Sequence, residues 1–340
     1  MIRFSFLFFI LIQAAAVARQ PTFKTILSDV PSSIRGLSVV DDRVAWFSGS
    51  KGYVGRTTNG GKTWKYSQVK FFEKLDFRSL YAFDSLHAIV ANAGSPASIL
   101  KTLDGGKTWK EVYHRDHPDI FLDGIDFWDR QTGLIYGDPI DGKMVLIKTT
   151  DSGETWKDVS SGQSPTLERG EASFAASGTG IRCYEKNKAV IATGGLVSRL
   201  WVTQDGGAGW SFRTAPMVQG KNSTGIFSVG ANRGLIIIVG GDFVADSLSS
   251  HHVYCSKDEG KNWVFPKTPT RGYRSCVEFI FRKTWIAVGQ GGLDLSEDNG
   301  MNWKSFSDVK GLHVVRMARK GAMILAAGNG KVVSVLLNRD

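Results

Sequence analysis

Cysteine is scarce in this chain. Only three cysteines, Cys183, Cys255 and Cys276, occur among 340 residues, and no Cys-x-x-Cys pair is present. This number excludes a disulfide framework, because it allows at most one disulfide and one free thiol. All three lie in apolar segments with the character of β-strands, so we expect small buried apolar side chains.

Long apolar runs are also absent after the N-terminal segment, and stretches such as Leu235–Val239 suffice only for a buried strand. The start of the chain combines Arg3, an apolar run over residues 4–12 and the triplet Ala16-Val17-Ala18. This pattern is typical of a secretory signal peptide. The sequence therefore predicts cleavage after Ala18, no membrane span, and export of residues 19–340 to the periplasm or the medium.

The excess of positive charge is not concentrated anywhere. The formal net charge is +10, but the lysines and arginines are scattered and form no block, which argues against a nucleic-acid partner. No phosphate-binding loop, Gly-x-Ser-x-Gly elbow or dinucleotide fingerprint occurs, so we expect no cofactor. The histidine pairs His114/His117 and His251/His252 lack further placeable ligands, so we expect solvated loop histidines and no metal site.

What the chain does contain is an eight-residue repeat. Its pattern is Ser/Thr, any residue, Asp/Asn, any residue, Gly, any residue, Thr/Asn (Gly once), Trp. The six copies are TTNGGKTW (57–64), TLDGGKTW (102–109), TTDSGETW (149–156), TQDGGAGW (203–210), SKDEGKNW (256–263) and SEDNGMNW (296–303). The tryptophans are 40 to 54 residues apart, a period that indicates a repeat architecture.

Each copy has the chemistry of a tight β-hairpin turn. The Asp or Asn oxygen can accept hydrogen bonds from the amides of the turn, and the invariant glycine can take the positive φ angle that a hairpin loop needs. The repeat resembles the Asp-box, or bacterial neuraminidase repeat, motif. We interpret its Asp residues as ties of the turn and not as catalytic or calcium-binding groups.

Cutting each unit into four strands, A to D, predicts the fold. After the sixth box the chain supplies three more strands, at residues 313–318, 323–326 and 331–336, and no fourth. Residues 23–27, ahead of the first unit, are predicted to form a strand that belongs to none of the units. Placing them as the fourth strand of the seventh unit closes a ring and removes open edges. We therefore predict an all-β, single-domain, seven-bladed β-propeller with four-stranded antiparallel blades over residues 19–340, present as a monomer.

Connectivity then predicts which residues meet at the central channel. The boxes are C–D loops, so they lie on the face opposite the D–A and B–C loops. The A-strand starts at the mouth of the channel are Arg35, Arg78, Asp123, Thr179, Gly225, Arg274 and His313. Loops of the same face add Asp138, Arg169, Glu171, Arg199 and Asp242. The guanidinium group of arginine presents paired N–H donors that match the two oxygens of a carboxylate. This set therefore predicts a site for an anionic or sugar ligand. The alternative is a polar channel whose arginines are paired with Asp123 or Glu171.

Sialidases share the Asp box and a carboxylate-binding arginine triad, and this resemblance implies a second function. They also carry a Phe-Arg-Ile-Pro segment, for which this chain offers only Phe77-Arg78-Ser79 and Ile34-Arg35-Gly36. They have six blades where we count seven. The alternative function is a sialidase-like hydrolase acting on an anionic glycan, with Glu171 and either Asp138 or Asp242 as the carboxylate pair.

A second resemblance runs from about Arg35 to Trp303. The segments GRTT (55–58), GEASFAASG (170–178), GIFS (225–228), VGGDF (239–243) and GYRS (272–275) resemble exported bacterial relatives of the photosystem II stability/assembly factor. The resemblance implies a seven-bladed Asp-box propeller that acts by binding protein partners. Our leading hypothesis is a non-catalytic scaffold that presents its channel mouth to a protein or glycan.

Overall fold

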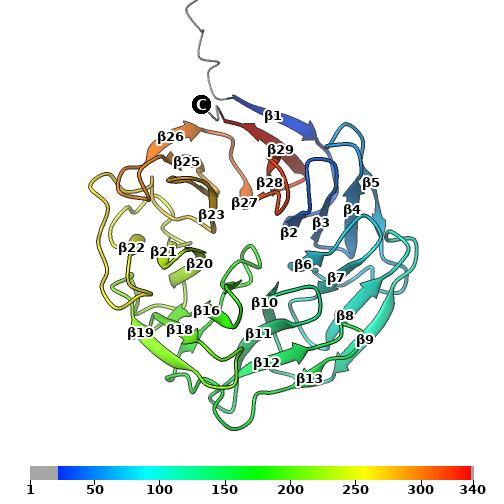
Figure 1. Cartoon of the computed structure of the whole chain (residues 1–340), viewed down its shortest axis with the longest axis horizontal. Coiled ribbons are helices and arrows are strands. Elements are labelled where there is room, and N and C mark those ends of the chain that lie inside the picture. The colour runs from blue at the N-terminus through cyan, green and yellow to red at the C-terminus, as the bar shows by residue number, and fades with distance from the viewer. Residues whose placement is uncertain (1–21, 338–340) are drawn as a thin grey trace, which may run out of the picture.

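The computed structural model describes residues 22–337, which form strands, turns and loops arranged as seven sheets around a central channel (Figure 1). This confirms the predicted seven-bladed propeller. Each blade is an antiparallel sheet whose A strand lines the channel. Within these residues, no helix has the length and apolar character needed to cross a bilayer.

The blades follow one another along the chain. The first contains β2 (Ile34–Val39), β3 (Ala45–Gly49), β4 (Tyr53–Thr57) and β5 (Lys65–Gln68). The second contains β6 (Ser79–Ala82), β7 (Ala88–Ala91), β8 (Ala97–Thr102) and β9 (Lys110–Arg115). The third contains β10 (Leu122–Phe127), β11 (Gly133–Ile140), β12 (Lys143–Thr149) and β13 (Lys157–Asp158). The fourth contains β15 (Ile181–Tyr184), β16 (Lys188–Ala192), β18 (Arg199–Thr203) and β19 (Ser211–Thr214).

The remaining blades include the two irregular ones. The fifth contains β20 (Thr224–Asn232), β21 (Leu235–Asp242) and β22 (Val253–Ser256), extended at its inner edge by β17 (Gly194–Gly195) and β14 (Glu171–Ala172). The sixth contains β23 (Cys276–Phe281), β24 (Thr284–Gly289), β25 (Gly292–Ser296) and β26 (Lys304–Ser307). The seventh contains β27 (Leu312–Met317), β28 (Ile324–Gly328), β29 (Lys331–Leu336) and β1 (Thr22–Leu27).

The first described strand closes the ring, as predicted. β1 pairs antiparallel with β29, with Phe23 opposite Val335 and Thr25 opposite Val333 (Figure 1). The two ends of the described chain therefore lie in one blade. The predicted signal peptide lies outside the described residues.

The fourth strand of the fifth blade, expected directly after its Asp box, is reduced to a single residue pair at Val264. Only an isolated bridge forms there, in which Cys255 and Val264 exchange backbone hydrogen bonds of 3.0 and 2.8 Å. Pro266 has no N–H to extend a ladder, and Lys267 already donates to Met301 O of the sixth blade at 2.9 Å. The chain therefore leaves the fifth blade after one pair.

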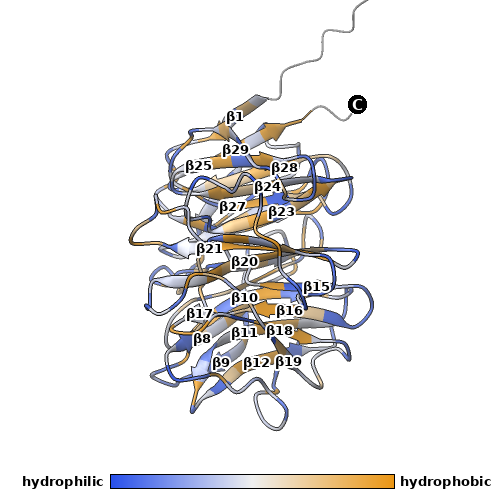
Figure 2. Ribbon diagram, turned by 90° about the vertical axis from the view of Figure 1, so that its left-hand side faces the viewer, coloured by the Kyte–Doolittle hydropathy of each residue, from blue (hydrophilic) through white to orange (hydrophobic). Residues whose placement is uncertain are grey.

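Burial follows the position of a strand within its blade. The middle strands are enclosed on both faces by the neighbouring blades, so β7 and β24 are buried throughout. The outermost strand β5 is exposed along its length. Strands enclosed on both faces are apolar without strict alternation, and Figure 2 shows the apolar colour concentrated on the strands.

The Asp boxes tie their own turns, as interpreted from the sequence. In the third copy, Thr155 N donates to Asp151 Oδ1 at 3.0 Å and the Gly153 amide donates to Thr149 Oγ1 at 2.9 Å. The Ser152 amide donates to the A–B loop of the same blade, at Gln131 O (2.9 Å). The box therefore lies on the face of the A–B loops, away from the mouth formed by the D–A and B–C loops.

Candidate functional site

β-Bulges place side chains at the mouth of the channel. The register of the A and B strands shifts at Arg35 in β2, Asp123 in β10, Phe227 in β20 and His313 in β27. A bulge inserts one residue that the ladder does not pair and re-aims its side chain. Three of these four residues were predicted from the alignment of A strands. In the fifth blade the bulge residue is Phe227, two positions after the predicted Gly225.

The connection before the fourth blade crosses the channel. We call residues 173–178 the plug loop. It is held from several blades: Ser173 N donates to Asp138 Oδ1 (2.8 Å), Arg35 Nη1 donates to Ala176 O (2.9 Å), and Ser177 Oγ donates to Ser275 O (2.7 Å). In Figure 1 the green segment ahead of β16 reaches toward the centre of the ring. The plug loop therefore gives the mouth a floor.

Above this floor lies a cavity of about 510 Å³, which we call the mouth cavity. Its lining combines cationic, polar and aromatic side chains from most of the blades. It consists of Arg35, Arg78, Phe121, Asp138, Ser173, Phe174, Ala175, Ala176, Asn222, Phe227, Phe243, Tyr273, Gln290 and His313. Four residues predicted for the site, Arg35, Arg78, Asp138 and His313, are therefore brought together.

The two arginines of the mouth cavity differ in their partners. Arg78 Nε forms an ion pair with Asp76 Oδ2 at 2.7 Å. Arg35 has no carboxylate within ion-pair distance among residues 22–337 and donates instead to the Ala176 carbonyl. Burial and the nearby Arg78 charge lower the pKa of Arg35 from its usual value, in a range where arginine stays charged. A positive charge without a carboxylate partner therefore faces the cavity.

Aromatic rings form a further part of the cavity lining. Phe174 of the plug loop stacks on Phe227 with ring centroids 3.8 Å apart, and Tyr273 packs edge-on against Phe227 at 4.8 Å. Phe243, at the end of β21, extends this wall, and half of its surface is exposed. A ligand here would meet both arginine and apolar rings.

His313 is neutral in this arrangement. Its Nε2 lies 2.9 Å from Asn329 Oδ1, which only accepts, so Nε2 carries the hydrogen. Nδ1 then accepts from Gln290 Nε2 at 3.2 Å. Burial and the charge of Arg35 lower the pKa of His313 to about 4. His313 therefore adds a hydrogen-bonding surface at pH 7 and no charge.

Asp123 lies behind the cavity wall and not in it. Its side chain has no exposed surface, and neither carboxyl oxygen has a hydrogen-bond partner in the described structure. The Asp138 amide is nearby but donates to Phe121 O at 3.0 Å. Burial and the Asp138 charge raise the pKa of Asp123 well above its usual range. Asp123 is therefore buried and neutral. It does not pair with the channel arginines, as it would in the alternative interpretation of a purely polar channel.

Glu171 and Arg199 are paired with each other outside the mouth cavity. Arg199 Nε lies 3.0 and 3.1 Å from the two Glu171 oxygens, and Thr193 Oγ1 donates to Glu171 Oε1 at 2.5 Å. The Glu171 side chain is fully buried. The predicted convergence of this pair on the channel is wrong, because the B–C loop of the fourth blade folds back onto β14. Glu171 is therefore not placed as a free carboxylate for glycoside hydrolysis.

Arg274 is also withdrawn into the protein. Its Nε donates to Asp294 Oδ2 at 2.9 Å, and Arg271 shares the same carboxylate at 3.0 Å. The pairing carboxylate comes from β25, a C strand, which the alignment of A strands did not consider.

Two further predicted residues lie at the periphery. Asp242, at the end of β21, accepts from the amides of Val244 and Ala245 and lies 3.5 Å from Lys221 Nζ. Arg169 is exposed ahead of β14. Neither residue lines the mouth cavity.

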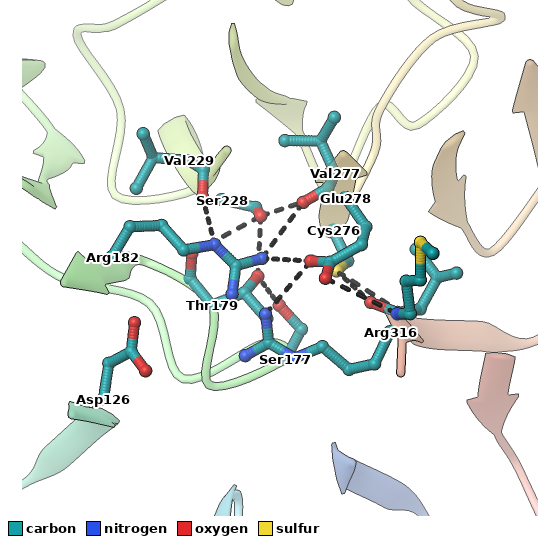
Figure 3. A network of polar contacts seen from close by, with 12 residues as sticks. Asp126, Ser177, Thr179, Arg182, Ser228, Val229, Cys276, Val277, Glu278 and Arg316 are labelled. Carbon is teal, nitrogen blue, oxygen red and sulfur yellow. Dashed lines mark hydrogen bonds and ion pairs between the residues drawn. The ribbon is translucent and has the colours of Figure 1, made fainter. Parts of the chain in front are cut away.

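A second polar network occupies the channel farther along the A strands, on the Asp-box side. Arg182 and Arg316 converge on the Glu278 carboxylate at 2.5 and 3.2 Å, and Asp126 lies nearby (Figure 3). Burial raises the pKa of Glu278 despite the opposing charge of Arg182. Sequence reasoning missed this network because its members lie in the interiors of A strands and not at their starts.

The three cysteines are free; Cys255 and Cys276 are buried as predicted, whereas Cys183 is only partly buried. His252 is a correction, because it is buried and donates to Thr270 O at 2.9 Å instead of being solvated. Within residues 22–337, no group of three or more His, Cys, Asp or Glu side chains is arranged to hold a metal ion.

The sequence analysis missed most of the aromatic wall. Phe174 and Tyr273 lie beside predicted residues, in segments GEASFAASG and GYRS that had been quoted for their resemblance alone. Their role depends on the plug loop crossing the channel, which no local pattern indicates. The sequence feature that could have indicated this crossing is the length of the connection before the fourth blade.

The fold and its six boxes define a seven-bladed Asp-box β-propeller. Residues 15–117 match the family model described as Photosynthesis system II assembly factor YCF48. No curated protein sequence matches the chain.

Solved structures show the same architecture. One described as YCF48 bound to D1 peptide has a TM-score of 0.67 at 17% identity, covering 94% of this chain and 99% of the other. YCF48 from Cyanidioschyzon merolae has a TM-score of 0.63 at 15% identity, covering 92% and 98%. The GH74 xyloglucanase from Xanthomonas campestris has a TM-score of 0.58 at 12% identity, covering 92% of this chain and 53% of the enzyme. The chain is thus an Asp-box propeller with the same fold as the YCF48 structures, and its residues 15–117 are similar in sequence to that family.

Proposed function

We propose that this protein is a binding scaffold that holds a segment of a protein partner in the mouth cavity. The observation that carries the proposal is that Arg35 and Arg78 line the same cavity as the rings of Phe174, Phe227 and Tyr273. Such a cavity suits a peptide that presents a carboxylate next to an apolar side chain. The likeness to YCF48 bound to D1 peptide supports a peptide as the ligand.

The chemistry of arginine supports a carboxylate as the recognised group. A guanidinium presents parallel N–H donors that match the two oxygens of a carboxylate, and it stays charged when partly desolvated. Arg35 donates to a single backbone carbonyl, so its other N–H groups are available to a ligand. The rings add apolar contact area, which gives most of the binding free energy in such anchors.

A glycan that carries a carboxylate is the second candidate, and the same arginine pair favours it. Hydrolysis of such a glycan by Glu171 is not supported, because Arg199 and Thr193 already occupy its carboxyl oxygens. The proposal also includes export of the mature chain as a monomer after removal of the predicted signal peptide. Mass spectrometry of the N-terminus in cell fractions and light scattering of the purified protein test these two parts.

Removing the arginine charges tests the function directly. A panel of peptides with an acidic residue or a free C-terminus beside an aromatic residue is screened by fluorescence anisotropy, next to uronic and sialic acid glycans. Arg35→Ala and Arg78→Ala are expected to weaken binding of the selected ligand by about 10- to 100-fold each, because each removes a charge-assisted hydrogen bond of about 1.5–3 kcal/mol.

Arg43→Ala is the matched control, since this exposed arginine lies on the Asp-box face beside Gly60. It removes the same charge and is expected to leave the affinity unchanged. Equal losses in Arg43→Ala and Arg35→Ala would mean that binding depends on net charge alone, and the mouth cavity would not be the site.

A further inference from the structure

Among the described residues that line the mouth cavity, only Asp138 carries a carboxylate. This residue lies at the end of β11, and Oδ1 accepts the Ser173 amide of the plug loop at 2.8 Å. No arginine or lysine forms an ion pair with it among residues 22–337. An ionised Asp138 would therefore oppose any anionic ligand at the arginine pair.

Behind Asp138 lies a second carboxyl group, Asp123, which keeps its proton. Asp123 on β10 is completely buried, and its two oxygens, the Tyr136 hydroxyl and Ser79 Oγ all lack partners in the described structure. A carboxylate without donors and without solvent is too costly to persist, so Asp123 carries a proton. Two neighbouring carboxyl groups titrate as a pair, and the second ionises with difficulty once the first is charged.

Every other charged or titratable group that faces Asp138 can be assigned. Arg78, with Asp76 behind it, comes from the second blade, Arg35 from the first, Tyr273 from ahead of β23, His313 from the seventh, and Asp123 and Tyr136 from its own blade. The arginines stay charged and both tyrosines stay neutral. His313 is neutral through its bond to Asn329. Asp138 is therefore the group whose charge changes in the accessible pH range.

We propose that the mouth cavity takes up its anionic ligand together with one proton, which is held by Asp138. The Asp123–Asp138 pair holds one proton in the empty cavity and two in the occupied cavity. The negative charge of the ligand then replaces that of Asp138 beside Arg35 and Arg78, and the net charge of the site is unchanged. Affinity consequently falls as pH rises. This inference rests on the proposed function, because it requires an anion at the arginine pair.

The sign and size of the effect follow from linkage. When binding takes up one proton, the association constant falls up to tenfold per pH unit between the Asp138 pKa in the free protein and that in the complex. Burial raises the pKa of Asp138. The fall therefore begins above the ordinary range of an aspartate.

The probe is N-acetyl-L-phenylalanine, which carries one carboxylate and one ring and is ionised above pH 5. Its binding to the full chain is measured by titration calorimetry from pH 5 to 8 in two cationic buffers of different ionisation enthalpy. The buffer dependence of the heat gives the number of protons taken up. We expect an uptake approaching one proton and a fall in affinity of at least tenfold across this range. The amide of the same compound is expected to bind weakly and without pH dependence.

Asp138→Asn is the diagnostic variant. It is expected to bind the probe at least tenfold more tightly than the wild type at pH 8, with a flat pH profile and no proton uptake. Asp141→Asn is the matched control, because this exposed aspartate lies on the same hairpin at a φ of 52° that asparagine also adopts. It is expected to keep the wild-type pH profile.

The outcomes separate the two proposals. Failure of the wild type to bind the probe at any pH, with the arginine variants equally inert, overturns the proposed site and the proton linkage with it. Binding that Arg35→Ala weakens, but with a flat pH profile and no proton uptake in the wild type, overturns the linkage alone. Thermal unfolding of each variant verifies that a loss of binding does not reflect loss of the fold, and carbon NMR of labelled aspartates reports the Asp138 titration directly.

Discussion

In three of the six Asp boxes the glycine satisfies two conditions at one residue. Gly153 has a φ of 77°, and a Cβ at this position would lie 2.3 Å from Ile89 Cδ1 of the preceding blade. Gly61 approaches Ile26 and Gly300 approaches Ile237 in the same way. Only glycine takes this φ without strain and leaves room for the neighbouring blade. In these boxes the turn is therefore also a contact between blades.

Gly153→Ala is expected to lower the free energy of unfolding by about 2–4 kcal/mol, since it combines a left-handed backbone with overpacking against Ile89.

Ser152→Gly is expected to have the opposite effect. Ser152 has a φ of 64°, and the first, second and fourth boxes carry glycine there. This variant is expected to raise the free energy of unfolding by about 0.5–1 kcal/mol. Urea denaturation measures both, and equal effects of the two substitutions would contradict this account.

At the scale of the element, the six boxes are one structure repeated with small chemical changes. In the second box, Thr108 Oγ1 donates to Asp104 Oδ2 at 2.6 Å, and in the first box Asn59 Nδ2 donates to Thr63 Oγ1 at 2.8 Å. The direction of the bond is reversed while the turn is kept. Hydrogen bonds from the Thr108 hydroxyl and amide lower the pKa of Asp104 to about 2, and those from Asn262 lower that of Asp258 to about 2.

These values predict how stability depends on pH. The unfolded chain binds protons at the box aspartates near pH 4 and the folded chain only near pH 2, so their contribution is fully present above about pH 4 and is lost as pH falls toward 2. Buried Asp123 and Glu278 have raised pKa values, so the folded chain holds their protons more tightly and stability falls as pH rises above about 4. The lowered pKa values of His313 and His252 oppose this fall, because the unfolded chain binds their protons more tightly than the folded chain up to about pH 6.5. We therefore expect the steepest loss of stability on the acid side, below pH 4.

Thermal unfolding between pH 2 and 7 measures this profile. Asp104→Asn converts the second box to the chemistry of the first and is expected to reduce the loss of stability between pH 4 and 2. If the variant loses stability between pH 4 and 2 as steeply as the wild type does, the box aspartates are not the cause of this loss.

At the scale of the whole molecule, stability depends on a joint between segments that are distant in sequence. β1 covers the outer edge of β29, and its partly buried residues Ile26 and Leu27 pack against the cluster that includes Val333 and Val335. No hairpin loop connects β29 to β1. The seventh blade therefore has no loop in which an Asp box could stand. An uncovered β29 would present a row of unpaired backbone groups to other molecules.

Deletion of residues 22–27 is therefore expected to lower the melting temperature by at least several degrees and to cause concentration-dependent aggregation. Differential scanning calorimetry and light scattering measure these effects. Adding β1 as a separate peptide is expected to restore part of the stability. A deletion variant that stays monomeric with an unchanged melting temperature would show that closure is not needed.

The amino-acid sequence by itself determined the fold, because the turn chemistry and strand patterning are local and repeat six times. Counting boxes and leftover strands was enough to predict seven blades and the closure by residues 23–27. The same local reasoning placed Arg35, Arg78, Asp138 and His313 at one mouth.

Only the tertiary structure decided which predicted residues meet a ligand. Arg274 and Glu171 are as polar in sequence as Arg35, but Asp294 and Arg199 are close enough to pair with them. Arg35 has no such neighbour in the part of the chain that the structure describes. The plug loop likewise becomes a floor only because several blades hold it across the channel. Pairing and enclosure depend on distances between blades, and no local pattern of residues encodes those distances.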